Sequence, residues 1–530
     1  MSLVSVKCLL FIAIVMVVYF FIVPKKYQYM VLLVASYVFY IWSDLRIPIF
    51  LMSSTILVYV CGIMISKIYE KQAEAVKNGP YDYSAEMKRK ALTHFQKRRK
   101  RILLAGLLMN FGILAVVKYY GFIAVGINQL LSTFSLGSPI ESFNPLIPLG
   151  ISFYTFQSLG YLIDVYRGKY PAERNLAKFA LFVSFFPQIV QGPIGRYDHL
   201  TKTLYAPHDF DYERIKYGIQ LILWGFFKKL AIGDRANIFV TALLSDAQAN
   251  PGLGIALGVF AFTVQVYADF SGGIDVARGI SQCLGIELSE NFRRPYFAVS
   301  IQDYWRRWHI SLGTWMKDYL LYPITFSKWF SKFSKRSRRL FKGHLGKVLP
   351  TCIAMAIVFF VVGIWHGAEW KYIMFGVYNG ALIVLGTLFD KRIKLFFLKH
   401  PRITADRIGW RIAAVLKTFI LVYIGKFFAC AGSVFQAFSW LHSVSLSYQY
   451  SISPTVAVIR SLSDNLILLI FSTGLLFCVS LAQERGIHIR ETLARKSIAT
   501  RFAVYLVSFT VLLCLTINFG SVKGFIYEQF

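Results

Sequence analysis

The sequence predicts an all-α integral membrane protein that crosses the bilayer many times. Of its 530 residues, 56% are hydrophobic and only 16% are charged, whereas about 25% of the residues of a typical soluble domain carry a charge. Apolar runs of roughly 20 residues, the length of a bilayer-spanning helix, recur along the whole chain. Lys and Arg gather between these runs, as they do in the loops of membrane proteins.

We expect about 11 to 13 transmembrane or re-entrant helices. The clearer segments lie near residues 4–23, 28–44, 48–66, 102–126, 176–190, 214–232, 252–269, 349–364, 371–389, 410–430, 462–482 and 502–519. Three further apolar stretches, 146–164, 272–286 and 296–323, are interrupted by Gly, Pro or charge. These are predicted to be short, tilted or re-entrant helices inside the protein, where irregular backbone is tolerated at membrane depth.

The distribution of charge predicts the orientation of the chain. Four basic segments, 67–101, 328–347, 391–411 and 485–501, are expected to face the cytoplasm. Residues 120–166 and 427–459 contain no Lys or Arg and are expected to face outward. The segment 67–101 looks helical, and two interpretations are open for it, a surface-lying amphipathic helix and a solvated linker.

No internal repeat or appended soluble domain is evident, so residues 1–530 are interpreted as a single integral membrane domain. The first apolar run, Val4 to Val23, is interpreted as a membrane helix rather than a cleaved signal peptide. We expect a multi-pass protein of the cell membrane whose first partner is the lipid bilayer.

Several function classes are excluded by composition and motifs. A net charge of +31 would suggest nucleic acid in a soluble protein, but here the cations lie in loops and no nucleic-acid motif occurs, so we expect no nucleic-acid partner. The seven cysteines form no CxxC pair, which argues against a metal site. No P-loop, dinucleotide fingerprint, zincin motif or nucleophile elbow is present.

His366 is the first candidate for chemistry. It follows a long apolar run that starts at a basic loop, and a helical rise of about 1.5 Å per residue carries it past the middle of the bilayer. Ionisable residues at that depth are costly and mark functional sites, and histidine exchanges protons near neutral pH. Gly363, Trp365 and Gly367 flank it. We interpret His366 as a candidate general base; the alternative is a core histidine hydrogen-bonded between helices.

The segment Asn291 to Pro323 is unusually polar for so apolar a chain. Asp303 and Arg307 are four residues apart and can pair on one helix face. The segment would suit a phosphate-bearing, anionic donor; the alternative is an interfacial amphipathic helix with an aromatic belt. The residues that we expect to contact the donor are Arg293, Arg294, Asp303, Trp305, Arg306, Arg307, Trp308 and, from the stretch around His366, Trp365.

Two other constellations interrupt apolar segments. Asp269, Asp275 and Arg278 lie around Gly272 and Gly273, and a broken helix with charged residues is also typical of ion-coupled transporters. The stretch Phe185 to Arg196 contains two Pro, two Gly and two Gln. It predicts a helix-breaking turn at membrane depth whose amides satisfy the freed backbone, a structural role rather than a catalytic one.

Three motifs in order resemble the membrane-bound O-acyltransferase (MBOAT) family. They are NFRRPY at 291–296, YWRRWHISL at 304–312 and GIWHG at 363–367. The QGPIGRY stretch at 191–197 also resembles the bacterial branch of alginate O-acetyltransferases, peptidoglycan O-acetyltransferases and D-alanyl-lipoteichoic acid transferases. The resemblance spans about residues 10–385, with additional membrane helices in 390–530.

The resemblance implies a helical fold around a central tunnel, with His366 at its centre as catalytic residue and His309 as the second catalytic histidine. It implies no bound cofactor. The expected donor is a cytoplasmic acyl thioester, either acetyl-coenzyme A or an acylated carrier protein. The expected acceptor is a hydroxyl of an extracytoplasmic polysaccharide or cell-wall polymer, reached directly or through an extracytoplasmic acetyltransferase partner, which places the chain in the bacterial plasma membrane.

Two alternatives remain open at the level of sequence. Within the enzyme class, the transferred group could be D-alanyl, with teichoic acid as the acceptor, instead of acetyl. In another class, the chain would be an ion-coupled transporter that uses Asp269, Asp275 and Arg278.

Overall fold

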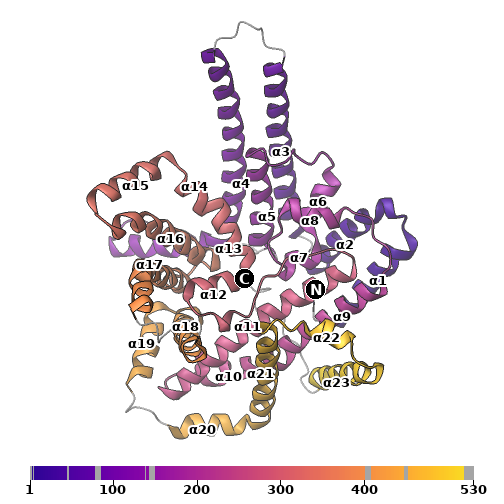
Figure 1. Cartoon of the computed structure of the whole chain (residues 1–530), viewed down its shortest axis with the longest axis vertical. Coiled ribbons are helices and arrows are strands. Elements are labelled where there is room, and N and C mark those ends of the chain that lie inside the picture. The colour runs from indigo at the N-terminus through magenta and orange to yellow at the C-terminus, as the bar shows by residue number, and fades with distance from the viewer. Residues whose placement is uncertain are drawn as a thin grey trace. The chain divides into compact units, whose positions relative to one another are not determined.

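The computed structural model of the chain is helical (Figure 1). It describes residues 5–44, 47–77, 85–137, 139–141, 150–399, 407–446 and 452–517, together with residues 3 and 148. Within these residues the only β pairing is one isolated antiparallel bridge, Phe292 to Trp308. The chain divides into two compact units, Met1–Lys216 with Ile280–Ser289, and Tyr217–Gly279 with Glu290–Phe530. Each is described by itself.

The first unit holds the N-terminal helices. They are α1 (Val6–Val17), η1 (Val18–Ile22), η2 (Lys25–Tyr27), α2 (Gln28–Ser43), α3 (Ile47–Lys77), α4 (Ala85–Thr133), α5 (Ile151–Tyr166), α6 (Leu176–Ser184), α7 (Phe186–Gln191) and α8 (Tyr197–Leu204).

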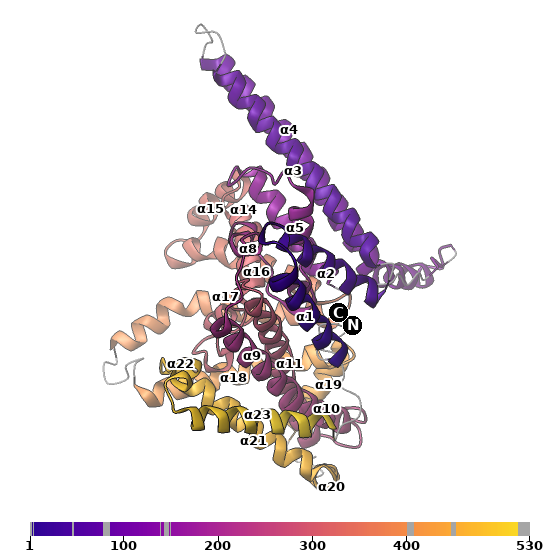
Figure 2. The ribbon, with the colours of Figure 1, turned by 90° about the vertical axis from the view of Figure 1, so that its right-hand side faces the viewer.

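A long hairpin of α3 and α4 dominates this unit and extends well beyond its shorter helices (Figures 1 and 2). Helix α4 has 49 residues, which at about 1.5 Å per residue is more than twice the thickness of a bilayer core. The basic segment 67–101 continues the two membrane-crossing helices along their axes, apart from residues 78–84, which lie outside the described residues. The expectation that this segment is helical is confirmed for residues 67–77 and 85–101, and the linker interpretation does not hold for them.

The predicted interruption at 185–196 is confirmed. Helix α6 ends at Ser184, α7 covers Phe186–Gln191 and the chain is then extended at Gly192. The Gln188 amide donates to the carbonyl of Pro193 at 2.8 Å and to the Gln157 side chain at 2.8 Å. A side-chain amide thus satisfies backbone freed by the break, as expected for irregular structure without access to water.

The second unit contains the remaining helices. They are α9 (Tyr212–Phe227), which begins in the first unit, then η3 (Lys228–Gly233), α10 (Asp234–Leu244), α11 (Leu253–Cys283), η4 (Pro295–Phe297), α12 (Ile301–Arg307), α13 (Ile310–Met316), η5 (Lys317–Leu321), α14 (Tyr322–Thr325), α15 (Lys328–Leu340), α16 (His344–His366), α17 (Trp370–Lys399), α18 (Ile408–Cys430), α19 (Val434–Ser445), α20 (Ile452–Ser461), α21 (Ser463–Glu484), α22 (Ile489–Ala494) and α23 (Ile498–Ile517).

Glycines bring α16 and α17 into close contact. A Cβ atom at Gly363 of α16 would lie 2.7 Å from the carbonyl oxygen of Tyr372, and one at Gly376 of α17 would lie 2.8 Å from Gly363 Cα. Small residues at such crossings let membrane helices approach backbone to backbone. The pair fixes the end of α16, where His366 is the last residue.

The expectation of a broken helix around Gly272 and Gly273 is wrong, because α11 runs without interruption from Leu253 to Cys283. Gly272 and Gly279 instead allow close packing against α9. A Cβ at Gly272 would lie 2.8 Å from the carbonyl oxygen of Gly225 in α9, and one at Gly279 would lie 2.6 Å from that of Gly218. Two glycine contacts, seven residues apart on each helix, hold α9 against α11.

Seven described helices are long and apolar enough to cross a membrane. They are Pro48–Lys77, Arg89–Thr133, Leu253–Cys283, His344–His366, Trp370–Ile393, Ile408–Cys430 and Ser463–Glu484. Shorter apolar helices occur at Val6–Ile22, Leu176–Gln191 and Ile498–Ser508. The predicted class, an all-helical protein with many membrane spans, is confirmed, and the predicted irregular stretch 296–323 is a chain of short helices.

We predict that Gly376→Ala destabilises the protein by about 1–3 kcal/mol, because the added methyl overpacks the contact between α16 and α17. The melting temperature of the detergent-solubilised protein measures the effect. Gly474→Ala in α21 is the matched control, since a Cβ there meets nothing within 4 Å. Equal melting temperatures of the two variants would contradict the packing role of Gly376.

Candidate active site

The structure brings His309 and His366 together in the second unit. His309 lies between α12 and α13, and His366 ends α16. The indole of Trp365 contacts both imidazoles, its ring centre 5.6 Å from that of His309 and 5.1 Å from that of His366. Phe375 of α17 covers His366 edge-on at 5.7 Å. Aromatic rings thus surround both imidazoles.

A short antiparallel ladder presents His309. The backbone N–H of Arg293 donates to the carbonyl of Arg307 at 2.9 Å, and that of Ile310 donates to the carbonyl of Asn291 at 3.0 Å. His309 itself has the left-handed backbone conformation, with φ of 48°. A non-glycine residue in that region costs on the order of 1–3 kcal/mol and persists only where its surroundings impose it. We call residues 291–294 and 307–310 the ladder.

The side chain of Asn291 orients the His309 imidazole. Its Oδ1 accepts from the backbone N–H of Ser311 at 3.0 Å and from the Ser311 hydroxyl at 2.9 Å. A backbone N–H can only donate, so the Asn291 side-chain atom that faces Ser311 must be the amide oxygen and not the amide nitrogen. His309 Nδ1, 3.2 Å from the same oxygen, must then carry the proton. The neutral ring therefore has its basic nitrogen at Nε2.

His309 is 1% exposed and lies between helices, outside the candidate membrane spans. Burial, together with the neighbouring His366 imidazole, lowers the pKa of His309 to about 3. The ring is consequently neutral at physiological pH and a weak base.

A cavity of about 330 Å³ reaches His309. Its lining includes two exposed cations, Arg306 and Lys317, and the buried His309. Among the described residues no carboxylate lies within 4.0 Å of either cation. The wall between them is mainly apolar and includes Trp305, Leu312, Met355, Val358, Phe359 and Val362.

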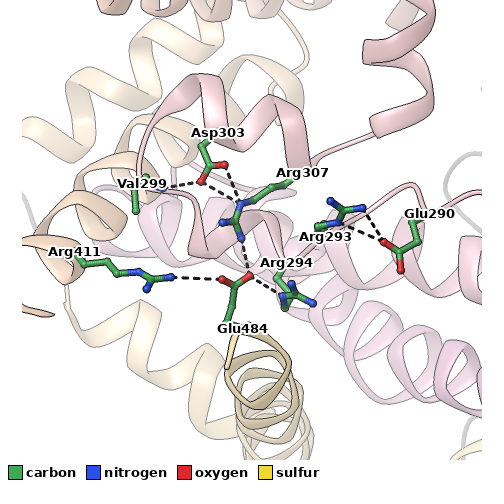
Figure 3. Close-up of polar contacts among 8 residues, drawn as sticks. All are labelled: Glu290, Arg293, Arg294, Val299, Asp303, Arg307, Arg411 and Glu484. Atoms are coloured by element: carbon green, nitrogen blue, oxygen red, sulfur yellow. Dashed lines mark hydrogen bonds and ion pairs between the residues drawn. The ribbon is translucent and has the colours of Figure 1, made fainter. Parts of the chain in front are cut away.

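The arginines of the motif segment divide into two groups. Arg294 and Arg307 both contact Glu484, the last residue of α21, and Arg307 also contacts Asp303 (Figure 3). Arg293 is 60% exposed and pairs with Glu290. Of the predicted donor-contacting residues, Trp305 and Arg306 line the cavity. Arg294, Asp303 and Arg307 form a network of ion pairs.

Trp308 and Trp365 have core positions. Trp308 is 4% exposed and packs with Phe270 and Tyr304, and Trp365 contacts both histidines. Neither tryptophan lines the cavity.

Three residues of this region were not found from the sequence. Asn291 was seen only as part of a motif. Lys426 of α18 is 4% exposed, and its ammonium lies 4.5 Å from the centre of the Trp308 indole. Glu484 ends an apolar span. A lysine inside a span and a glutamate at its end are the signals that could have drawn attention to the last two.

The carboxylates of the transporter alternative are each held by lysine. Lys229 lies 2.6 Å from Asp269 and 2.9 Å from Asp234. Lys228 lies 2.8 Å from Asp275, which also approaches Arg278 at 3.6 Å. A buried carboxylate that is compensated in this way stabilises helix packing, and the arrangement favours a structural role over an ion-binding site.

The fold and the site define a polytopic, all-helical membrane protein in which the buried His309 lies close to the partly buried His366. Residues 171–433 match the MBOAT, membrane-bound O-acyltransferase family. The chain is 32% identical to the probable alginate O-acetylase AlgI of Pseudomonas aeruginosa over 411 residues, which cover 77% of this chain and 67% of the relative.

Two other relatives carry different names. The peptidoglycan O-acetyltransferase of Helicobacter pylori is 29% identical over 329 residues, 57% of this chain and 58% of the relative. The teichoic acid D-alanyltransferase of Bacillus subtilis is 31% identical over 291 residues, 54% of this chain and 69% of the relative. The chain belongs to the membrane-bound O-acyltransferase family, and it is a multi-pass membrane enzyme that transfers acyl groups.

We predict that His309 contributes to acid sensitivity. An unfolded histidine binds a proton below about pH 6.5, whereas native His309 does not until about pH 3, so the native state loses stability as the pH falls through this window. The melting temperature should fall less between pH 7 and pH 5 in His309→Gln than in the wild type. His199→Gln, an exposed histidine, is the control, and an unchanged pH dependence in His309→Gln would refute the prediction.

Proposed function

We propose that the enzyme moves an acyl group, acetyl in the first instance, from a cytoplasmic thioester to a hydroxyl of an extracytoplasmic polysaccharide or cell-wall polymer in the bacterial plasma membrane. The observation that carries this proposal is the cavity, which connects exposed Arg306 and Lys317 with buried His309. The relatives support the acceptor class, because their names include alginate, peptidoglycan and teichoic acid.

The cavity fits a donor that is anionic at one end and apolar at the other. Phosphates of a coenzyme A or of a carrier-bound phosphopantetheine would meet the two cations at the mouth. The thioester would extend along the apolar wall towards His309. Basic residues also dominate the loops that are predicted to face the cytoplasm, where such thioesters are made.

In the proposed reaction, His366 removes the proton from the acceptor hydroxyl. The oxygen attacks the thioester carbonyl, a C–O bond forms and the C–S bond breaks. The departing thiolate takes the proton back from His366, so that the products are an ester and a free thiol. His309, neutral and fixed by Asn291, orients or polarises the reactants.

The acyl group then leaves on the outer side, either on the polymer itself or on a partner acetyltransferase that relays it. D-alanyl transfer to teichoic acid is the second candidate, favoured by the likeness to the Bacillus subtilis protein. Proteoliposomes loaded with labelled acetyl-coenzyme A or with a D-alanylated carrier protein, with alginate oligomers, peptidoglycan fragments or lipoteichoic acid outside, separate these cases by which label appears on which polymer.

We predict that His366→Ala lowers the transfer rate by a factor of about 10² to 10⁴, the usual contribution of a general base. The rate of labelled product formation measures the loss. His199→Ala, which replaces an exposed histidine of the first unit, serves as the control. Full activity of a correctly inserted His366→Ala protein would rule out the proposed role of this residue.

We also predict that Arg306→Gln and Lys317→Gln raise KM for acetyl-coenzyme A several-fold, since each removes a cation from the mouth of the cavity. The same variants should use S-acetyl-N-acetylcysteamine, a thioester without phosphates, as well as the wild type does. Arg460→Gln, an exposed arginine outside the cavity, should change neither substrate. Equal effects on both thioesters would show that these cations do not recognise phosphate.

A further inference from the structure

Glu484, the last residue of α21, contacts three arginines from other parts of the second unit. Its Oε1 accepts from Arg294 Nε at 2.6 Å and from Arg307 Nη1 at 2.7 Å, while Oε2 lies 3.7 Å from Arg411 (Figure 3). The Glu484 side chain is 10% exposed, and those of Arg294 and Arg307 are 25% and 19% exposed. Charge-assisted hydrogen bonds in such a setting are short and directional.

The two closest arginines come from opposite strands of the ladder. Arg294 ends the first strand, and Arg307 begins the second. Asp303 also binds Arg307, but it lies on the same helix and cannot join the strands. A single oxygen atom of Glu484 therefore ties the two strands together from outside the segment.

The ladder carries unusual backbone strain. In the second unit, Arg294 and His309 are the non-glycine residues with positive φ among those described, at 47° and 48°. Each conformation survives only where its surroundings hold it. Glu484 binds the side chain of Arg294, one of these two residues, and that of Arg307, which lies two residues before the other, His309.

Arg306 and Arg307 are neighbours in the sequence but make different contacts. Arg307 binds Glu484, whereas Arg306 is exposed and lines the cavity.

Glu484 lies beyond residue 433, where the family match ends, although the ladder that it binds lies inside the match. A residue of the C-terminal helices thereby touches the part of the chain that presents a catalytic histidine.

We propose that Glu484 is a positioning residue of the active site, which ties Arg294 to Arg307 and so holds His309 in the orientation that acyl transfer requires. This role rests on the proposed function. It makes the C-terminal helices part of the catalytic apparatus and predicts that Glu484 affects the turnover step, not the capture of the thioester.

The first test is kinetic. Glu484→Gln keeps the shape of the side chain but removes its charge, and we expect kcat to fall about 10- to 100-fold, the scale of a small misplacement of a catalytic group, while KM for acetyl-coenzyme A stays within about twofold. Glu484→Asp, which keeps the charge, should recover part of kcat. Glu290→Gln is the matched control, because Glu290 pairs with exposed Arg293 in the same segment (Figure 3).

The second test does not depend on activity. Hydrogen–deuterium exchange followed by mass spectrometry reports on the amides of Arg293, Ile310 and Ser311, which donate within the ladder. Glu484→Gln should exchange faster in peptides that contain 291–294 and 307–311, with unchanged exchange in α16, and Glu290→Gln should match the wild type.

The outcomes separate the two proposals. Unchanged kcat and unchanged exchange in Glu484→Gln would overturn the positioning role, as would a loss of activity that only follows a general loss of folded protein. A wild-type enzyme that transfers no acyl group from any thioester would overturn the proposed function; a selective loosening of the ladder would still show what Glu484 holds.

Discussion

The hydrogen bonds of the Asn291 side-chain oxygen are the contacts on which the site depends. This one atom accepts from Ser311 twice and from His309 Nδ1. It fixes the tautomer of the imidazole, the turn into α13 and the register of the ladder together. In a buried setting such a contact has no competition from water, so each of its donors would be costly to leave unpaired. The position of His309 relative to Trp365 and His366 follows from it.

The charged residues of the second unit include some that form ion pairs between helices and some that line the cavity. Buried ionisable groups are expensive in a membrane protein, and most of those found here are compensated within the chain, as Lys228 and Lys229 are by Asp275 and Asp269. Arg306 and Lys317, by contrast, face a cavity. Arg306 and Lys317 therefore lie where an anionic substrate would enter, whereas Lys228 and Lys229 lie where helices must pack.

Much of the fold could be predicted because long apolar runs separated by basic loops indicate membrane-spanning helices and few other structures. His366 stood out as an imidazole within such a run, and His309 through the motif around it. The continuity of α11 could not be predicted, since a glycine such as Gly272 can either break a helix or let a neighbouring backbone approach closely. Glu484 was missed because it acts on residues 177 and 190 positions away, and no local pattern encodes a partner so distant.

Acyl transfer is proposed to take place where the cavity reaches His309, close to His366. An experimental structure of the protein in lipid nanodiscs with a non-hydrolysable thioether analogue of acetyl-coenzyme A tests it most directly. The phosphates should lie beside Arg306 and Lys317, and the acyl carbon should lie next to the two imidazoles. An analogue bound in another part of the chain, with this cavity empty, would contradict it.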